Sequence, residues 1–144
     1  MNTCELCETQ GGEVVWQDGL CRVLRVGGEA GVNFPGFCRV VWNAHVAEMT
    51  DLPAADQRHL MNLVFATEAA LRSLLQPDKI NLASLGNIVP HLHWHVIPRW
   101  RDDSHFPEPI WATARHSIPL QRSLDNADLA AMISELLSEE VCGA

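Results

Sequence analysis

The segment His91-Leu92-His93-Trp94-His95-Val96-Ile97 decides the fold, because a histidine stands at every second position and apolar residues fill the rest. Bulky and β-branched apolar residues favour a strand. A strand sends alternate side chains to opposite faces, so the three histidines are expected to share one face, while Leu92, Trp94 and Val96 face the core. Imidazoles add little to a core, since their ring nitrogens need partners when buried. The segment therefore indicates chemistry carried on a strand.

The chain of 144 residues has the length of one domain with a real core, and its 47% hydrophobic and 19% charged residues are typical of a globular protein. Its formal net charge is −8, and its longest basic stretch is Arg99-Trp100-Arg101. Polymeric DNA or RNA is bound through many phosphate contacts, so we expect no polymeric nucleic acid as a partner. A small-molecule nucleotide needs only a local site, and this charge does not exclude it.

The N-terminal residues Met1-Asn2-Thr3-Cys4-Glu5 contain neither a basic region nor an apolar stretch, so no signal peptide is expected. No apolar run approaches the ~20 residues of a membrane span. We therefore expect a cytoplasmic protein with no membrane partner.

Five cysteines are present, an odd number that fits reduced thiols or a metal site better than a disulfide framework. Cys4 and Cys7 form a Cys-x-x-Cys pair, in which two thiolates three positions apart can chelate a metal ion. A structural zinc site needs four ligands, and no second such pair exists, so histidines would have to supply the others. Cys21 and Cys38 are expected to be small buried hydrophobes within strands.

Alternating apolar residues separated by turn signals predict a series of strands. Asp18-Gly19 is a strong hairpin signal between the first two. The Gly-rich residues 27–35 are expected to form a loop, and Gly86-Asn87 breaks the chain before the histidine segment. The strands are expected at residues 14–16, 20–26, 37–42, 79–85 and from about residue 91.

Two amphipathic helices are also predicted. Asp51 is expected to be the N-cap of a long helix with Pro53 in its first turn, and Pro77 closes this helix after five or six turns. Asp125 is expected to cap a shorter helix that runs to about Glu140. The pattern predicts an α+β fold, in which an antiparallel sheet carries one long helix and a short C-terminal helix.

The histidine segment resembles the signature of the histidine-triad (HIT) superfamily, His-φ-His-φ-His-φ-φ with φ apolar, which residues 91–97 match at every position. The residues Leu85 to Pro90, and those from Pro35-Gly36 to His45, also resemble compact bacterial members. The resemblance covers about residues 1–110 and implies a HIT-like fold and a homodimer. Residues 111–144 are expected to form a C-terminal extension with a helix, within the same single domain.

The resemblance implies an enzyme that hydrolyses or transfers at the α-phosphorus of nucleoside phosphates, such as dinucleoside polyphosphates, phosphoramidates or acyl-adenylates. It makes His93 the nucleophile. A neutral imidazole is a good nucleophile near neutral pH and a fair leaving group, so a covalent nucleotidyl-histidine splits one displacement into two. His95 is expected to contact a non-bridging phosphate oxygen or to help proton transfer, and His91 completes the catalytic set. The proton of His93 must point toward an acceptor away from substrate, which in the family is a backbone carbonyl of the triad.

Asn81 and Asn87 precede the triad at positions where family members carry polar residues that reach the ribose or the phosphate. Both are therefore candidate substrate-binding residues. Asn87 follows Gly86 and fits a simple turn residue equally well. The chain departs from the family at Ile88, where several branches have Ser or Thr, and the stretch between Asn81 and Gly86 is short. These departures bear on the choice of substrate rather than on the core reaction.

Zinc-bearing members of the family use a Cys pair, a histidine after the central strand and the first histidine of the triad. Cys4, Cys7, His45 and His91 match these four positions, which implies a structural zinc ion remote from the substrate. Two alternatives stay open, a redox-active cysteine pair and two unused thiols. A redox pair generally lies at a helix N-terminus after a strand, whereas this pair lies at the start of the chain.

Two other functions are compatible with the histidine strand. His-x-His on a strand is also a metal-ligand geometry, so the alternate histidines could hold a catalytic zinc ion in a metal-dependent hydrolase. The chain could also be a non-catalytic nucleotide-binding module. His105, in the loop at residues 101–111, is a minor candidate for the site, and Trp100 and Trp111 are candidates for a dimer interface or a base pocket.

Overall fold

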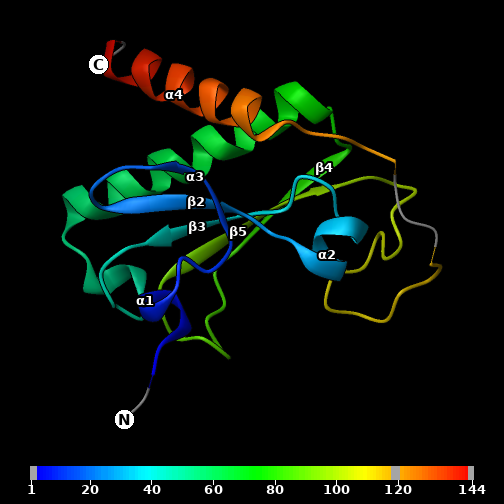
Figure 1. Ribbon diagram of the computed structural model, residues 1–144, viewed down its shortest axis with the longest axis horizontal. Coiled ribbons are helices and arrows are strands. Elements are labelled where there is room, and N and C mark those ends of the chain that lie inside the picture. Colours follow the sequence, from blue (N-terminus) through cyan, green and yellow to red (C-terminus); the bar gives the residue numbers. More distant parts are fainter. Residues whose placement is uncertain (1–2, 118–120, 143–144) are drawn as a thin grey trace.

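The computed structural model describes residues 3–117 and 121–142, and the centre of this part of the chain is a five-stranded antiparallel sheet (Figure 1). The strands lie side by side in the order β1-β2-β3-β5-β4. A loop joins β4 to β5, whereas the chain between β3 and β4 passes over the sheet as a long helix. The strands are β1 (Glu13–Gln17), β2 (Cys21–Arg25), β3 (Cys38–Trp42), β4 (Lys79–Ala83) and β5 (His93–Arg99).

One face of the sheet is covered by two helices, α3 (Ala54–Leu75) and α4 (Asn126–Cys142), which Figure 1 shows above the strands. α3 packs on β3 and β5, and α4 packs on α3 and β1. Together they bury one continuous apolar cluster against the sheet. Burial of a large aliphatic side chain is worth about 1.5–3 kcal/mol, so this cluster supplies most of the hydrophobic driving force. Its fully buried members include Val23, Val40, Leu63, Leu71, Val96, Leu129 and Ile133.

The opposite face carries two short helices, α1 (Glu5–Glu8) and α2 (Gly28–Asn33), at two separate ends. Each end has a small apolar cluster of its own. Between these clusters lies the strip of sheet from which His93 and His95 project. The cluster under α1 contains Leu6, Leu24 and Val41, and the cluster beside α2 contains Phe34, Phe37 and Ile97.

The pairing of β3 with β5 decides which side chains point to which face. Leu92, Trp94 and Val96 all join the apolar cluster on the α3 face, as the alternation predicts. Arg39 lies directly opposite His95, so both side chains belong to the other face. The central strand therefore separates a core side from a polar side.

The prediction that Asp51 caps the long helix is wrong. Residues Met49–Asp51 form a short 3-10 helix (η1) of their own, in which the Asp51 carboxylate accepts a hydrogen bond from the Glu48 backbone N–H at 2.9 Å. The long helix α3 begins only at Ala54, directly after Pro53. The fixed φ of proline suits a helix start without a side-chain cap.

Two further boundaries differ from the prediction. The expected loop at residues 27–35 contains α2, and the expected strand from His91 begins only at His93. The His91 backbone N–H donates to the Val89 carbonyl oxygen at 2.8 Å, so a turn holds His91 outside the β5 ladder. The other strands agree with the prediction within two residues at each end.

The cap of the last helix is confirmed, because the Asp125 carboxylate accepts hydrogen bonds from the Ala127 and Asp128 backbone N–H groups at 2.7 and 3.2 Å. The α+β architecture with an antiparallel sheet is likewise confirmed. None of the helices in the described residues is both long and apolar enough to cross a bilayer. A domain boundary at residue 110 and a cytoplasmic location stay predictions.

Candidate functional site

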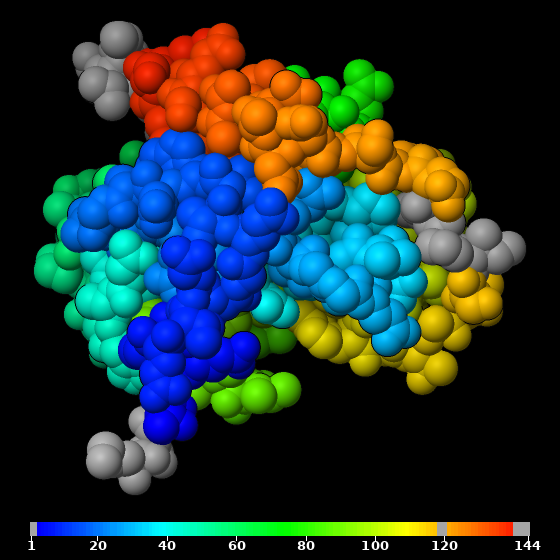
Figure 2. Space-filling model, viewed as in Figure 1, coloured from blue at the N-terminus to red at the C-terminus, as the bar shows by residue number. Residues whose placement is uncertain are grey.

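A cavity of about 540 Å³ lies over the strip of sheet that carries the histidines. It is lined by His93, His95 and Arg39 from the strands, and by residues of the N-terminal segment and of loop 85–89. Figure 2 shows this segment (dark blue) and this loop (light green) projecting together at one end of the molecule. Trp111 lines a further side. A cavity of this size suits a ligand as large as a nucleotide.

His93 is held in one tautomer. Its Nδ1 lies 2.6 Å from the backbone carbonyl oxygen of His91, so the Nδ1–H donates to that carbonyl. Nε2, on the far side of the ring, then keeps its lone pair. The Ser84 hydroxyl donates to the His93 carbonyl oxygen at 3.1 Å, which ties the start of β5 to the end of β4. The ring is thus arranged as a nucleophilic imidazole requires.

His95 lies beside His93, with the ring centroids 5.0 Å apart, and the Trp111 ring lies 5.3 Å from His95. Burial lowers the pKa of His95 to about 4, and the charges of His93 and Arg39 act in the same direction. The ring is therefore neutral at pH 7. Its Nδ1 is buried and has no hydrogen-bond partner among the described residues. A neutral imidazole with an unpaired nitrogen at a cavity can bind a polar ligand atom.

Arg39 is a cavity residue that the sequence analysis missed. It projects from β3 directly opposite His95 and lines the cavity. Its guanidinium lies over the Phe37 ring, 5.6 Å from the centroid. Burial lowers the pKa of Arg39 and the charge of Glu5 opposes this, but arginine remains a cation in proteins. The sequence does contain a sign of this role, because Arg39 is the one charged residue in the otherwise apolar stretch 37–42.

The two predicted substrate-binding asparagines lie in different surroundings. Asn87 is exposed and lines the cavity, next to Ile88, whose side chain is 95% exposed. Asn81 does not line the cavity, and its Oδ1 accepts a hydrogen bond from Arg99 Nη1 at 2.9 Å. Substrate binding stays a prediction for both residues, and the geometry favours only Asn87.

Arg99 and Asp103 form a buried ion pair beneath the loop that follows β5. Arg99 Nε and Nη2 donate to the two Asp103 oxygens at 2.8 and 3.0 Å, and the two side chains are 2% and 0% exposed. Burial acts to raise the pKa of Asp103, but hydrogen bonds from Arg99 and from the His105 and Phe106 backbone hold it below its usual value. His105 does not line the cavity, and its Nδ1 lies 2.7 Å from the Ser104 hydroxyl. The network therefore has a structural role.

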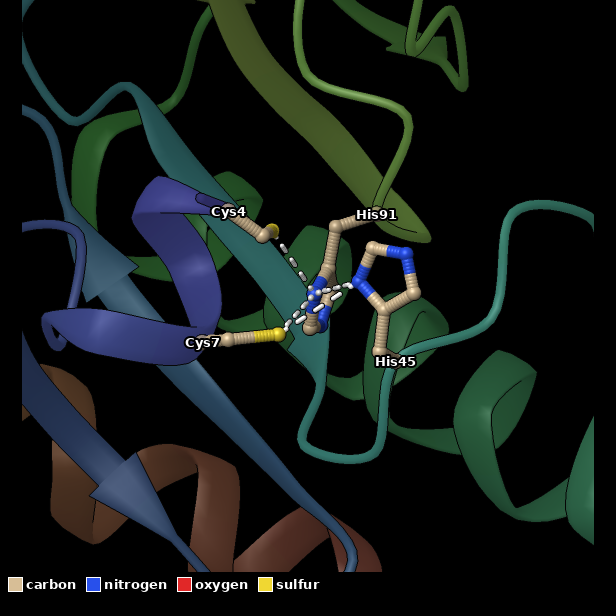
Figure 3. Close-up of side chains that lie close together, drawn as sticks. All are labelled: Cys4, Cys7, His45 and His91. Atoms are coloured by element: carbon tan, nitrogen blue, oxygen red, sulfur yellow. Dashed lines mark hydrogen bonds between the residues drawn. The ribbon is translucent and has the colours of Figure 1, made fainter. Parts of the chain in front are cut away.

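Cys4, Cys7, His45 and His91 bring their side chains together beside the cavity face (Figure 3). Cys7 Sγ lies 3.4 Å from the Nδ1 atoms of both histidines, these two nitrogens are 3.3 Å apart, and Cys4 Sγ lies 3.5 Å from His91 Nδ1. Zinc bonds of ~2.0–2.3 Å in a tetrahedron place the ligand atoms roughly 3.3–3.8 Å apart. The four residues therefore fit a tetrahedral metal ion, and the cluster could hold one.

His91 links this cluster to the cavity residues. Its Nε2–H donates to the Trp42 carbonyl oxygen at 2.6 Å, so Nδ1 faces the two cysteines and His45. Such a second hydrogen bond fixes the tautomer of a metal-binding histidine. Burial lowers the pKa of His91. His91 lies before β5 and does not line the cavity, so it differs in place from His93 and His95, which both line it.

Cys21 and Cys38 are fully buried, as predicted. Burial raises the pKa of Cys38 to about 12 and also raises that of Cys21, so both stay protonated at neutral pH. Cys21, Asp18 and His59 form the second group of metal-capable side chains among the described residues. However, Asp18 accepts backbone hydrogen bonds from Leu20 and Cys21 and pairs with His59 at 2.7 Å. These bonds account for the group as part of the β1–β2 turn and its contact with α3.

Comparison of the sequence with known protein families identifies the family of this chain. The family described as HIT domain matches residues 8–102, about two thirds of the chain. The chain belongs to the HIT family. The HIT match confirms the resemblance seen in the sequence, contains all three histidines of the triad, and lies within the residues 1–110 assigned to the domain.

Solved HIT proteins share the fold over nearly the whole chain. A histidine triad protein from Bradyrhizobium japonicum is 27% identical, covers 97% of both chains and has a TM-score of 0.67. A HIT protein from Sinorhizobium meliloti is 29% identical, covers 93% of this chain and 95% of that chain, and has a TM-score of 0.69. An AP-4-A phosphorylase from Mycobacterium tuberculosis is 30% identical over 78 residues, which make up 50% of this chain. The match spans only 40% of the length of that relative.

Proposed function

We propose that this HIT protein cleaves a bond at the α-phosphorus of nucleoside phosphates through a covalent nucleotidyl intermediate on His93. The contact of 2.6 Å between His93 Nδ1 and the His91 carbonyl oxygen carries the proposal, because it selects the tautomer of the neutral ring in which Nε2 holds the lone pair. The similarity to an AP-4-A phosphorylase supports chemistry on nucleotides. The acceptor of the nucleotide is water in hydrolysis and a second substrate in transfer.

In the first step, His93 Nε2 forms a bond to the α-phosphorus while the bond from phosphorus to the leaving group breaks. The leaving group departs with the bonding electron pair and takes a proton from solvent. The charge that develops on the His93 ring is stabilised by the His91 carbonyl, which accepts the Nδ1–H hydrogen bond. Neutral His95 can donate its ring N–H to a non-bridging oxygen. In the second step, water attacks phosphorus and loses a proton to solvent. The phosphorus–nitrogen bond breaks, its electron pair returns to His93 Nε2, and a nucleoside monophosphate leaves.

A trapping experiment tests this mechanism. The protein is quenched during turnover of an adenylated substrate that is radiolabelled at the α-phosphate. We expect an acid-labile adduct on His93, and His93→Ala is expected to lose the adduct and about 10⁴-fold in kcat. The matched control is His116→Ala, because His116 is an exposed histidine outside the cavity and should keep both adduct and activity.

The outcomes separate the alternatives. Undiminished turnover by His93→Ala contradicts the mechanism. Tight nucleotide binding without turnover, across dinucleoside polyphosphates, phosphoramidates and acyl-adenylates, indicates a non-catalytic binding module instead.

We further propose that Cys4, Cys7, His45 and His91 bind a structural zinc ion. The spacing of their ligand atoms and the fixed tautomer of His91 support this assignment. Zinc here would tie the N-terminal segment to the turn before β5 and would leave the substrate chemistry to the cavity residues. Neither metal-capable group in the described residues includes His93 or His95, so the geometry does not favour a catalytic zinc ion.

Metal analysis tests the zinc site. We expect about one zinc per chain in the wild type, very little in Cys4→Ser/Cys7→Ser, and an unchanged content in His116→Ala. Replacement by cobalt should give the absorption of a thiolate-bound ion. Loss of turnover on chelation with the fold intact would favour the metal-dependent hydrolase.

The homodimer expected from the family is also part of the proposal. Analytical ultracentrifugation should then give twice the chain mass of 16.0 kDa. A sedimenting species of 16.0 kDa at micromolar concentration would contradict it.

A further inference from the structure

Three arginines project from the cavity face of the sheet, and they differ in how they are bonded. Arg22 lies on β2, Arg39 on β3 and Arg99 on β5. The strand register places all three on the side of His93 and His95. Their hydrogen bonds therefore show which of them the fold itself requires.

Arg22 and Arg99 are fully engaged within the protein. Arg22 donates to the Leu6 and Gln10 carbonyl oxygens and to Asn43 Oδ1. Arg99 binds both Asp103 oxygens, Asn81 and the Glu108 carbonyl oxygen. Both side chains are buried, at 8% and 2% exposure. Their guanidinium groups hold the N-terminal segment and the loop after β5, respectively.

Arg39 lacks such partners. Its Nε is buried and forms no hydrogen bond with any described residue, and it takes part in none of the ion pairs among these residues. A buried donor without a partner is destabilising, and more so when the group is charged. The Phe37 ring under the guanidinium orients it but does not satisfy its N–H groups. The Glu5 carboxylate lines the same cavity and acts on the Arg39 charge, but it forms no ion pair with Arg39 among the ion pairs of the described residues. The unpaired Nε of a guanidinium at the cavity therefore points to a ligand anion.

The register also places this anion relative to the nucleophile. Val41 lies opposite His93, whereas Arg39 lies opposite His95, one pair further along the face and ~7 Å away. The Arg39 charge lowers the pKa of His95, which agrees with a position beside that ring. The phosphorus that His93 attacks must lie at His93 Nε2, so Arg39 is placed to bind a neighbouring group.

We propose that Arg39 binds a phosphate adjacent to the scissile one, so that the cavity prefers substrates with a second phosphate over substrates with an uncharged leaving group. The proposal rests on the proposed function for the position of the scissile phosphate. A planar guanidinium forms paired hydrogen bonds with phosphate oxygens, which an ammonium group cannot reproduce. Arg39 is thereby a specificity residue for nucleoside polyphosphates.

Calorimetric binding of ADP and AMP tests the proposal without any need for turnover. We expect the wild type to bind ADP at least about 10-fold more tightly than AMP, because hydrogen bonds to a charged group are stronger than those between neutral groups. Arg39→Gln should lose this difference while keeping its AMP affinity, and Arg39→Lys should recover part of it. Arg58→Gln is the matched control, since Arg58 is exposed on α3, on the other side of the sheet.

Equal losses for ADP and AMP in Arg39→Gln, or no loss for either, would overturn the proposal. These outcomes are independent of the trapping experiment. An adduct on His93 with an unchanged ADP preference overturns only the role of Arg39. An Arg39-dependent ADP preference without an adduct overturns only the covalent mechanism.

Discussion

The two faces of the sheet differ in what covers them. On the α3 side, two helices and the sheet share one continuous apolar cluster in which many side chains are fully buried. On the cavity side, two small apolar clusters lie apart, and charged or polar side chains occupy the strip between them. The difference indicates that continuous apolar packing stabilises the α3 face, whereas the cavity face leaves room for ligand and depends on a few buried polar contacts. Buried polar networks replace apolar packing on the cavity face.

The largest stability effect is expected on the cavity face, at its buried ion pair. Arg99→Met leaves the Asp103 carboxylate buried without its partner, and removal of one member of such a pair costs about 3–5 kcal/mol. Urea denaturation measures the loss in unfolding free energy. An effect below about 1 kcal/mol would contradict the structural role of this pair and sharpen the contrast between the faces.

A smaller effect is expected for one core side chain on the α3 face. Leu63→Ala should lower the unfolding free energy by about 3 kcal/mol, because Leu63 is 1% exposed within the continuous cluster. The matched control is Phe65→Ala on the same helix, where a 48% exposed side chain should change stability by less than about 1 kcal/mol. Nucleotide binding per folded molecule should not change in either variant. A specific loss of binding in Leu63→Ala would mean that the faces are not separable.

The ion pair also predicts a pH dependence. The folded-state pKa of Asp103 lies below its ordinary value of 3.8, so its ionised form stabilises the protein above that pH, and this contribution is lost as the pH falls toward the folded pKa. Between pH 5 and about pH 3, wild-type stability should fall more steeply than that of Asp103→Asn. Parallel pH profiles of the two proteins in urea denaturation would contradict the prediction.

The smallest expected effect concerns His95 on the cavity face. NMR titration of its ring should give a pKa of about 4, so His95 does not change charge between pH 5 and 8. Arg39→Gln should raise this pKa slightly, since burial and His93 are the larger causes of the shift. A wild-type value near 6.5, the ordinary histidine value, would show that the ring is open to solvent.

Residues close in sequence allowed much of the fold and site to be predicted. Alternation within the histidine segment gave the strand, its two faces and the family resemblance, and Asp125 identified the last helix start. The Cys-x-x-Cys spacing pointed to the cluster that the fold assembles. The histidine segment and the Asp125 cap each lie within or next to one element. The Cys-x-x-Cys pair was recognised because its spacing is typical of metal-binding cysteines.

The sequence did not predict features that depend on contacts between side chains and backbone groups from different parts of the chain. Arg39 becomes a cavity residue only because β3 pairs with β5 in this register, and Asn81 lies outside the cavity, where Arg99 of the neighbouring strand donates a hydrogen bond to it. Asp51 has the residue type of a helix cap, but its carboxylate bonds to Glu48 three residues earlier. Single-sequence patterns do not contain these competing partners.

The contact between Cys4 and His91 also bears on the order in which the molecule folds, since it joins residues that are 87 positions apart. Closing a long loop costs entropy, which is recovered only after its ends have met. α1 spans four residues, and helices this short do not persist alone in water. We therefore expect the segment that contains α1, although it precedes the strands in the chain, to be among the last to fold. The same late step then adds the N-terminal residues that line the cavity and forms the contacts of Cys4 and Cys7 with His91.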